Sequence, residues 1–273
     1  MNSPIGIFDS GYGGLTILSD IIKRLPQYDY IYLGDNARSP YGTRSFDIVY
    51  QYTLQAIKHL FDRGCRLIIL ACNTASAKAL RNIQQIDLPE IDPERRVLGV
   101  IRPTVEALSS FTKSGDIGIF ATPGTVASKS YEIEISKLYP SYRVFSQACP
   151  MWVPLVENNE MNNTGARYFI KRDVESLISK YPEIDTVILG CTHYPIIYDI
   201  IKSYLPENIN IIKQGNIVTE SLINYLSRHQ EIEKKCSKGG HIEFLTTEDP
   251  DRFNKIASRF LNLEIDASKI ILF

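Results

Sequence analysis

The chain has 273 residues, of which 44% are hydrophobic and 22% are charged, and its 30 Lys and Arg nearly balance its 31 Asp and Glu. This balance disfavours nucleic-acid binding and a charged tail, and no apolar run reaches the ~18 residues that a membrane-spanning helix needs. Because no secretory leader pattern precedes the first apolar run, we expect a cytoplasmic protein with neither nucleic acid nor membrane among its partners.

Short apolar runs rich in β-branched residues alternate with segments of helical periodicity. Strands are expected at residues 5–8, 30–33, 67–70, 97–100, 117–120, 186–189, 209–212 and 242–245. Helices are expected at residues 15–25, 44–64, 75–84, 165–181, 196–205, 217–228 and 250–260. The clearest is 44–64, with Ser45 as its expected N-cap and Gly64 after its last turn. Strands that are apolar throughout are typical of sheets covered on both faces, so we predict an α/β protein with largely parallel sheets.

A faint internal repeat divides the chain. IGIFDSG starts at Ile5 and IGIFATPG at Ile117, and Cys72 and Cys191 follow these starts at similar distances. Two similar, pseudo-symmetric domains explain the repeat, with the active site in the cleft between them, although a chance match is the alternative. The first domain is expected to comprise residues 1–101 plus 207–273, and the second residues 102–206.

The cysteine pattern indicates free thiols. The five cysteines are Cys65, Cys72, Cys149, Cys191 and Cys236, and no C-x-x-C pair occurs. An odd number of scattered cysteines disfavours a disulfide framework, and four histidines that lie far apart disfavour a structural zinc site. We therefore expect no metal, and no motif for a cofactor is clear.

Two cysteines stand where catalytic groups collect in such folds. Cys72 ends the strand of LIILACNTAS and Cys191 ends that of VILGCTHYPI, each just before a helix start. Ligands gather at the carboxyl ends of parallel strands, and a helix start lowers the pKa of a thiol. An inert buried cysteine, with Thr74 or Thr192 as a helix cap, is the alternative. Two thiols facing one cleft suit removal of a proton from one face of a carbon and delivery of a proton to the other.

Six motifs in order resemble those of the glutamate racemases of the aspartate/glutamate racemase superfamily. They are GIFDSGYGGLT (6–16), GDNARSPYGTRS (34–45), ACNTAS (71–76), ATPGT (121–125), CPMWVPLVE (149–157) and GCTHYP (190–195). The resemblance implies a cofactor-independent interconversion of L- and D-glutamate that supplies D-glutamate for peptidoglycan synthesis. It also implies a homodimer.

The resemblance also implies roles for individual residues. Cys72 would take the α-proton from D-glutamate and Cys191 from L-glutamate, with Asp9 beside the first thiol and with His193 and Glu157 on the second side. The residues expected to bind the substrate are Asp9, Ser10, Tyr41, Gly42, Asn73, Thr74, Thr122, Thr125, Thr192 and His193. Hydroxyl and backbone donors suit a dianionic substrate because they add no titrating base.

The chain departs from the family pattern at Arg102 and Thr104 in IRPTV and at Gln214 in KQGN. These departures are expected to affect the contact between the domains rather than the chemistry.

Other functions remain open on the sequence. A related racemase of aspartate, hydantoin or another acidic substrate is one, and a non-catalytic two-lobed protein that binds an acidic ligand is another. A nucleotide-dependent enzyme is a third, because GYGGLT and Asp35 are spaced like a dinucleotide fingerprint. Thr16 at the third glycine position and the charge of Asp9 disfavour it.

Overall fold

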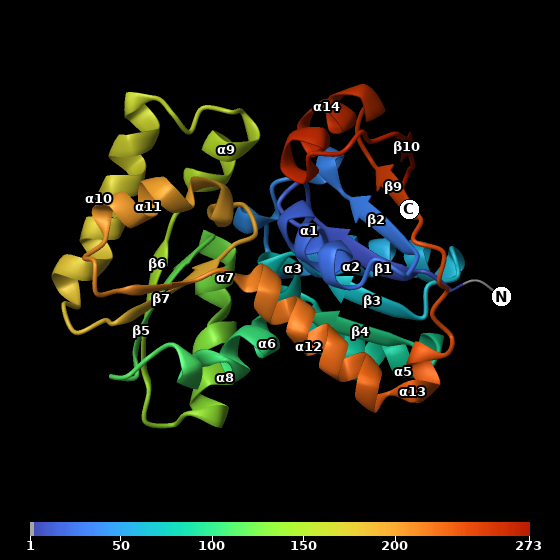
Figure 1. Cartoon of the computed structure of the whole chain (residues 1–273), viewed down its shortest axis with the longest axis horizontal. Helices are drawn as coiled ribbons and strands as arrows, with labels where there is room; N and C mark the ends of the chain where they lie inside the picture. Colours follow the sequence, from blue (N-terminus) through green and yellow to red (C-terminus); the bar gives the residue numbers. More distant parts are fainter. Residues whose placement is uncertain (1–2) are drawn as a thin grey trace.

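The computed structural model describes residues 3–273, and Met1 and Asn2, which the expected first domain includes, lie outside the described residues. Two β-sheets lie side by side with helices around them (Figure 1). The larger has the strand order β10-β9-β2-β1-β3-β4 and the smaller β6-β5-β7-β8. All the pairings between these strands are parallel, so the predicted α/β class is confirmed.

The eight expected strands are all present. The larger sheet contains β1 (Ile5–Asp9), β2 (Tyr30–Gly34), β3 (Leu67–Leu70), β4 (Arg96–Gly99), β9 (Ile242–Thr246) and β10 (Ala267–Lys269). The smaller sheet contains β5 (Asp116–Ala121), β6 (Arg143–Ala148), β7 (Thr186–Gly190) and β8 (Asn210–Ile212). Strands β6 and β10 were not predicted because RVFSQA and ASK are short of the apolar residues that mark a buried strand.

The two sheets share one topology. When the first four strands of each are numbered in chain order, both have the spatial order 2-1-3-4. The starts of the internal repeat lie in the equivalent strands β1 and β5, and Cys72 and Cys191 follow the equivalent strands β3 and β7. Strands β9 and β10 extend the larger sheet beside β2, so the end of the chain returns to the larger sheet.

Fourteen α-helical segments connect the strands in the described part of the chain. They are α1 (Leu15–Arg24), α2 (Phe46–Asp62), α3 (Asn73–Lys78), α4 (Leu80–Asn82), α5 (Leu88–Ile91), α6 (Ile101–Glu106), α7 (Pro123–Ser128), α8 (Ser130–Leu138), α9 (Trp152–Glu157), α10 (Thr164–Lys180), α11 (Tyr198–Tyr204), α12 (Gln214–Arg228), α13 (Gln230–Glu233) and α14 (Pro250–Leu261). No helix among residues 3–273 is long and apolar enough to cross a membrane.

The helix ends follow local rules. Ser45 caps α2 by accepting a hydrogen bond from the Ile48 N–H at 3.4 Å, and Gly64 has the left-handed φ of 91° that follows a helix end, as predicted. The helix expected at 75–84 begins earlier, at Asn73, because the Cys72 sulfur caps it. Helices α6 to α9 were not predicted; apart from α8 they have only six residues each, too few to show a clear periodicity.

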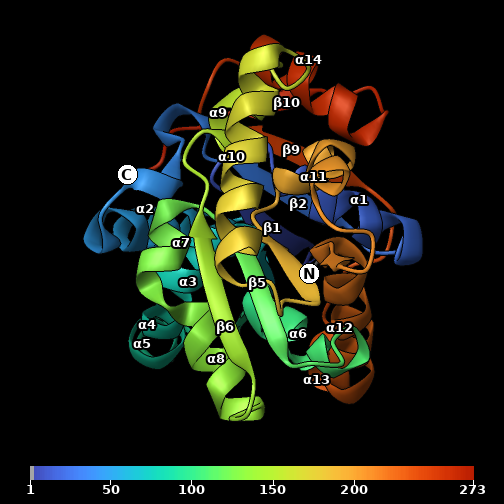
Figure 2. The ribbon, with the colours of Figure 1, turned by 90° about the vertical axis from the view of Figure 1, so that its left-hand side faces the viewer.

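Alternating side chains of the central strands cover both faces of the sheets. Ile5 and Ile7 of β1 pack on the side of α1, α12 and α14, whereas Phe8 packs on the side of α2. In the smaller sheet α10 lies along β6 (Figure 2). Burying each such aliphatic side chain contributes about 1.5–3 kcal/mol, so the sheets form a firm support for the loops at their carboxyl ends.

The expected division into residues 1–101 plus 207–273 and residues 102–206 stays a proposal. One detail of it needs correction, because β8 lies after residue 206 and yet pairs with β7. Residues 210–212 therefore belong to the smaller sheet, and the chain returns to the larger sheet only afterwards, through α12, which packs against both α1 and α6.

Candidate active site

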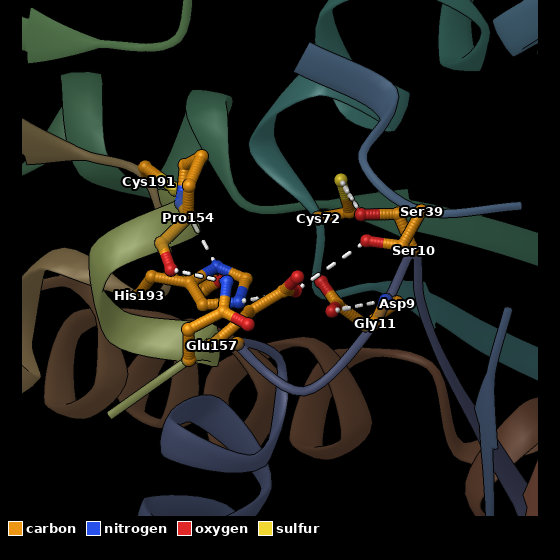
Figure 3. Close-up of polar contacts among 12 residues, drawn as sticks. Asp9, Ser10, Gly11, Ser39, Cys72, Pro154, Glu157, Cys191 and His193 are labelled. Atoms are coloured by element: carbon orange, nitrogen blue, oxygen red, sulfur yellow. Dashed lines mark hydrogen bonds and ion pairs between the residues drawn. The ribbon is translucent and has the colours of Figure 1, made fainter. Parts of the chain in front are cut away.

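Cys72 and Cys191 line one cavity of about 70 Å³. They lie on its opposite sides (Figure 3), and their exposed fractions are only 5% and 6%. The lining comes from the segments that follow β1, β2, β3, β5, β6 and β7, so the cavity lies where the carboxyl ends of both sheets meet. This is where parallel sheets collect ligands.

Most of the predicted site residues line this cavity. They are Ser10, Tyr41, Gly42, Cys72, Asn73, Thr74, Thr122, Cys191, Thr192 and His193. Three predicted residues are not part of the lining: Thr125 and Glu157 contact the lining residues Thr122 and His193, and Asp9 directly precedes the lining residue Ser10.

The cavity is also lined by residues that were not among the predicted site residues. They are Ser39, Pro40, Thr43, Pro123, Cys149, Pro150, Val153 and Pro154. They lie within three of the six motifs quoted above, so the motifs marked the right loops, but they could not show which side chains face inward.

The first thiol belongs to Cys72, at the N-cap of α3. Its sulfur accepts a hydrogen bond from the Ala75 N–H at 3.4 Å and lies 3.3 Å from the Ser10 hydroxyl. Burial, reinforced by the charge of Asp9, raises the pKa of this thiol to about 12. The expected lowering of the pKa by the helix start is therefore outweighed, and Cys72 carries its proton at neutral pH.

Asp9 ends β1 and is 1% exposed. Its Oδ2 accepts a hydrogen bond from the Gly11 N–H at 2.9 Å, whereas its Oδ1 has no partner among the described residues. Burial raises the pKa of this carboxyl above 3.8, although the neighbouring His193 opposes the shift. A buried carboxyl with a free oxygen is a group that can hold or pass on a proton.

The second thiol, of Cys191, has an imidazole beside it. Nδ1 of His193 lies 3.8 Å from the Cys191 sulfur, and its Nε2 lies 3.1 Å from Oε1 of Glu157 (Figure 3). Burial by itself lowers the pKa of His193, but the hydrogen bonds with Cys191 and Glu157 outweigh it and raise this pKa well above 6.5. The raised pKa favours the protonated imidazole, and a positive charge in this position can stabilise a thiolate during a reaction.

The glycine-rich turn after β1 brings the two sides together. A Cβ on Gly13 would lie 2.5 Å from both Nδ1 of His193 and Oγ1 of Thr192, so only glycine allows this approach. Nearby, the Thr16 hydroxyl donates to the Thr192 carbonyl at 3.0 Å. The position of the Cys-Thr-His turn therefore depends on the loop that carries Asp9.

Three threonine hydroxyls meet at the wall of the cavity. Oγ1 of Thr74 lies 3.0 Å from Oγ1 of Thr122 and 3.3 Å from that of Thr125, and Thr122 and Thr125 lie 3.1 Å apart. Thr74 lies in the first turn of α3, whereas the other two come from the start of α7. Such hydroxyls can turn to donate to a carboxylate.

Tyr41 contributes to the site differently from a hydroxyl donor. Its hydroxyl donates to Oδ2 of Asp35, which also accepts from Nε of Arg38 at 2.7 Å, while Oδ1 accepts from Thr247 at 2.9 Å. Only the ring and backbone of Tyr41 are therefore left for the cavity. Asp35 is fully buried and has both oxygens engaged, which removes the acidic residue that the dinucleotide interpretation needed.

The departures from the family pattern fall into two groups. Arg102 lies at the surface, paired with Glu106 at 2.7 Å and Glu134 at 3.2 Å. Gln214 is instead 2% exposed, and its Oε1 accepts a hydrogen bond from Nδ2 of Asn73 at 2.6 Å. The expectation that these departures affect the contact between the domains rather than the chemistry stays a prediction, although Gln214 contacts Asn73, a predicted substrate residue.

Comparisons with known proteins identify the family of the chain. Residues 16–221 match the family described as Asp/Glu/Hydantoin racemase. A glutamate racemase of Roseobacter denitrificans is 42% identical over 275 residues, covering 97% of this chain and 98% of the relative. The structure of a glutamate racemase isoform of Bacillus anthracis matches with a TM-score of 0.89 at 34% identity, covering 99% of this chain and 98% of that one. That of Francisella tularensis glutamate racemase, in complex with D-glutamate, matches with a TM-score of 0.86 at 32% identity, covering 99% and 97%. The chain therefore belongs to the Asp/Glu/Hydantoin racemase family of isomerases.

Proposed function

We propose that the protein interconverts L-glutamate and D-glutamate by moving the α-proton through two cysteines, without a cofactor. The observation that carries the proposal is the placement of Cys72 and Cys191 on opposite sides of one cavity, after equivalent strands of two similar sheets. A substrate carbon between them can lose a proton to one sulfur and gain a proton from the other.

Each direction uses both sulfurs in complementary roles. With L-glutamate, the Cys191 thiolate takes the α-proton, so the Cα–H bond breaks and an S–H bond forms. Cys72 then gives its own proton to the opposite face of the carbanion and is left as the thiolate. With D-glutamate the roles are exchanged, and the protons on the thiols exchange with solvent between turnovers.

The surroundings of the two sulfurs differ. Burial keeps the proton on Cys72, whose pKa is raised to about 12, whereas Cys191 has the imidazole of His193, with its raised pKa, beside it. Glu157 keeps His193 charged, and Asp9 can take up or return a proton as the charge moves towards Cys72.

Substrate binding would rely on neutral donors. The hydroxyls of Ser10, Thr74, Thr122 and Thr192 line the cavity and suit two carboxylates without competing for the α-proton. A carbanion beside a carboxylate also needs a prepared polar site from which water is excluded. The burial of both thiols fits that requirement.

The same proposal covers the cellular role. D-glutamate would be made in the cytoplasm for peptidoglycan synthesis, by a homodimer of this chain. Aspartate is the nearest competing substrate, and one methylene changes the binding free energy in a pocket by only about 1–3 kcal/mol.

A chiral assay tests the proposal. Purified protein is incubated with L-glutamate, D-glutamate, L-aspartate or D-aspartate without added cofactor, and the ellipticity is followed by circular dichroism. We expect both glutamate solutions to become racemic, and in D₂O the product gains deuterium at Cα. Product that keeps its protium contradicts the two-cysteine route, and glutamate that binds by calorimetry without losing ellipticity identifies a binding protein instead.

A further inference from the structure

The side-chain amide of Asn73, next to Cys72, is held at both ends by buried groups. Its Nδ2 donates to Oε1 of Gln214 at 2.6 Å, and its Oδ1 accepts from the Tyr131 hydroxyl at 2.7 Å. Gln214 and Tyr131 are 2% and 1% exposed, and neither lines the cavity. They belong to α12 and α8, so helices from distant parts of the chain converge on this one amide.

The orientation of Gln214 is set by the backbone. Its Nε2 lies 3.3 Å from the Val100 carbonyl and 2.8 Å from Oγ1 of Thr104. The Thr104 hydroxyl already donates to that same carbonyl at 2.7 Å, so its oxygen is left to accept. A carbonyl oxygen can only accept, and therefore the amino end of the Gln214 amide has to face this pair.

The orientation of Asn73 follows from that of Gln214. With its amino end at Val100, Gln214 turns its oxygen to Asn73, which has to present Nδ2. Oδ1 of Asn73 then faces the Tyr131 hydroxyl, which donates to it and accepts from Nε2 of Gln214 at 2.9 Å. All the donors and acceptors match in this one arrangement, which leaves one N–H of Asn73 without a protein acceptor among residues 3–273.

We propose that Gln214 and Tyr131 are positioning residues that make Asn73 present an N–H, rather than its oxygen, to a substrate carboxylate. The inference rests on the proposed function, because it needs an acidic substrate in the cavity that Asn73 lines. An amide with its oxygen inward would repel a carboxylate, so the network decides whether Asn73 attracts or repels the substrate. Gln214 stands in KQGN, where this chain departs from the family pattern.

The test compares kcat and KM of Gln214→Met and Tyr131→Phe with those of the unaltered protein. Each variant keeps most of the side-chain volume and loses the hydrogen bond to Asn73. We expect kcat/KM for glutamate to fall about tenfold, mainly through KM, which is the effect of one hydrogen bond to a charged group. Tyr131→Phe loses a single hydroxyl, so kcat and KM can still be measured on this variant if Gln214→Met does not fold.

Two threonines give a matched control. Thr104 and Thr219 are both 0% exposed, and each donates its hydroxyl to the carbonyl four residues earlier, at 2.7 and 2.8 Å. Only Thr104 also accepts from Gln214. We expect Thr104→Val to raise KM about threefold and Thr219→Val to leave KM unchanged. Equal effects of the two variants on KM would overturn the inference.

A double-mutant cycle separates this inference from the proposed function. In an Asn73→Ala background, Gln214→Met should change kcat/KM no further, because Gln214 acts only through Asn73. If turnover is then too slow, the Kd of D-glutamate from calorimetry replaces kcat/KM. An undiminished effect in that background sinks the positioning role, whereas an unaltered protein that does not racemise glutamate sinks the proposed function.

Discussion

Nδ1 of His193 lies 3.8 Å from the sulfur of Cys191, whereas the sulfur of Cys72 has the Ser10 hydroxyl beside it at 3.3 Å. The two sides of the cavity are thus similar in backbone and different in chemistry. L- and D-glutamate have equal free energies in water, so the equilibrium constant between them is one, and every variant has to change kcat/KM equally in both directions. The difference between the sides can therefore appear only in kcat and KM taken separately.

Replacing either cavity thiol should stop the reaction in both directions. We expect Cys72→Ser and Cys191→Ser each to lower kcat/KM by at least about 10³-fold, because a serine hydroxyl is too weak an acid and base for this proton transfer. Circular dichroism with each enantiomer measures the loss. Cys236→Ser is the control, since this buried cysteine bonds to the Ile232 carbonyl and does not line the cavity. Racemisation retained in either cavity variant would count against the mechanism.

Glu157→Gln should shift the pH dependence of the reaction. The Glu157 hydrogen bond helps to raise the pKa of His193, and an amide cannot replace its charge. The imidazolium is then lost at lower pH, so we expect the alkaline limb of the kcat/KM profile to move down by about one pH unit.

Stability gives an independent measure of the same change. A raised histidine pKa stabilises the fold fully below pH 6.5, and this stabilisation is lost as the pH rises through the folded-state pKa. Glu157→Gln should therefore lower Tm more at pH 7 than at pH 10. Glu231→Gln is the control, because Glu231 lies at the same 3.1 Å from the exposed His229. Identical pH profiles for Glu157→Gln and the unaltered protein would remove Glu157 from the site.

Asp9→Asn should raise the stability of the protein and lower its activity. Burial raises the pKa of Asp9 above 3.8. The stability that the protonated carboxyl contributes is complete below pH 3.8 and is lost as the pH rises through the folded-state pKa. At neutral pH the ionised carboxyl therefore weakens the fold. We expect Tm to rise by roughly 2–4 °C at pH 8, by less at pH 4.5, and kcat to fall about 10²-fold.

Asp185→Asn is the control, because the pKa of Asp185 is shifted in the opposite direction to that of Asp9. Hydrogen bonds from Thr112, Lys113 and Ser114 outweigh the burial of Asp185 and lower its pKa to about 2. Its stabilisation is present above pH 3.8 and is lost as the pH falls through about 2. This variant should lower Tm at pH 8 and leave kcat unchanged. A lowered Tm for Asp9→Asn at pH 8 would show that the carboxylate is well paired in the fold.

Gly13→Ala should push the loop after β1 away from the Cys-Thr-His turn. The added methyl group would lie 2.5 Å from Nδ1 of His193, so the loop or the Cys-Thr-His turn has to move. We expect kcat/KM to fall at least about 10²-fold with little change in Tm, because small displacements at a reacting centre are costly. Gly165→Ala serves as the control, since its methyl group would meet only Asn163, at 3.3 Å. Full activity in Gly13→Ala would mean that this close approach is dispensable.

Much of the fold could be predicted because strong local patterns carry it. Apolar runs marked the eight strands, and the similarity of the segments at Ile5 and Ile117 predicted two halves, which the shared 2-1-3-4 strand order supports. The strand-end positions of Cys72 and Cys191 followed from the same runs, and both line the cavity. Short helices such as α7 lack a readable period.

Contacts between distant segments could not be predicted. Nothing in KQGN indicates that Gln214 reaches Asn73, 141 residues away in the chain. The effect of burial was also hidden, since a sequence does not show that Asp9 keeps an oxygen without a partner or that Cys72 is too buried for the helix start to lower its pKa. These properties depend on which side chains the tertiary fold packs around a group.

The shared strand order bears on how such a site could arise. Half of this architecture, associated with an identical copy about a twofold axis, would already offer one sulfur from each copy to a common centre. In such a symmetric pair, both sulfurs have identical surroundings. Joining the halves in a single polypeptide removes this constraint, so that Ser10 can accompany one sulfur and His193 the other. Covalent fusion thereby permits a division of labour that exact symmetry forbids.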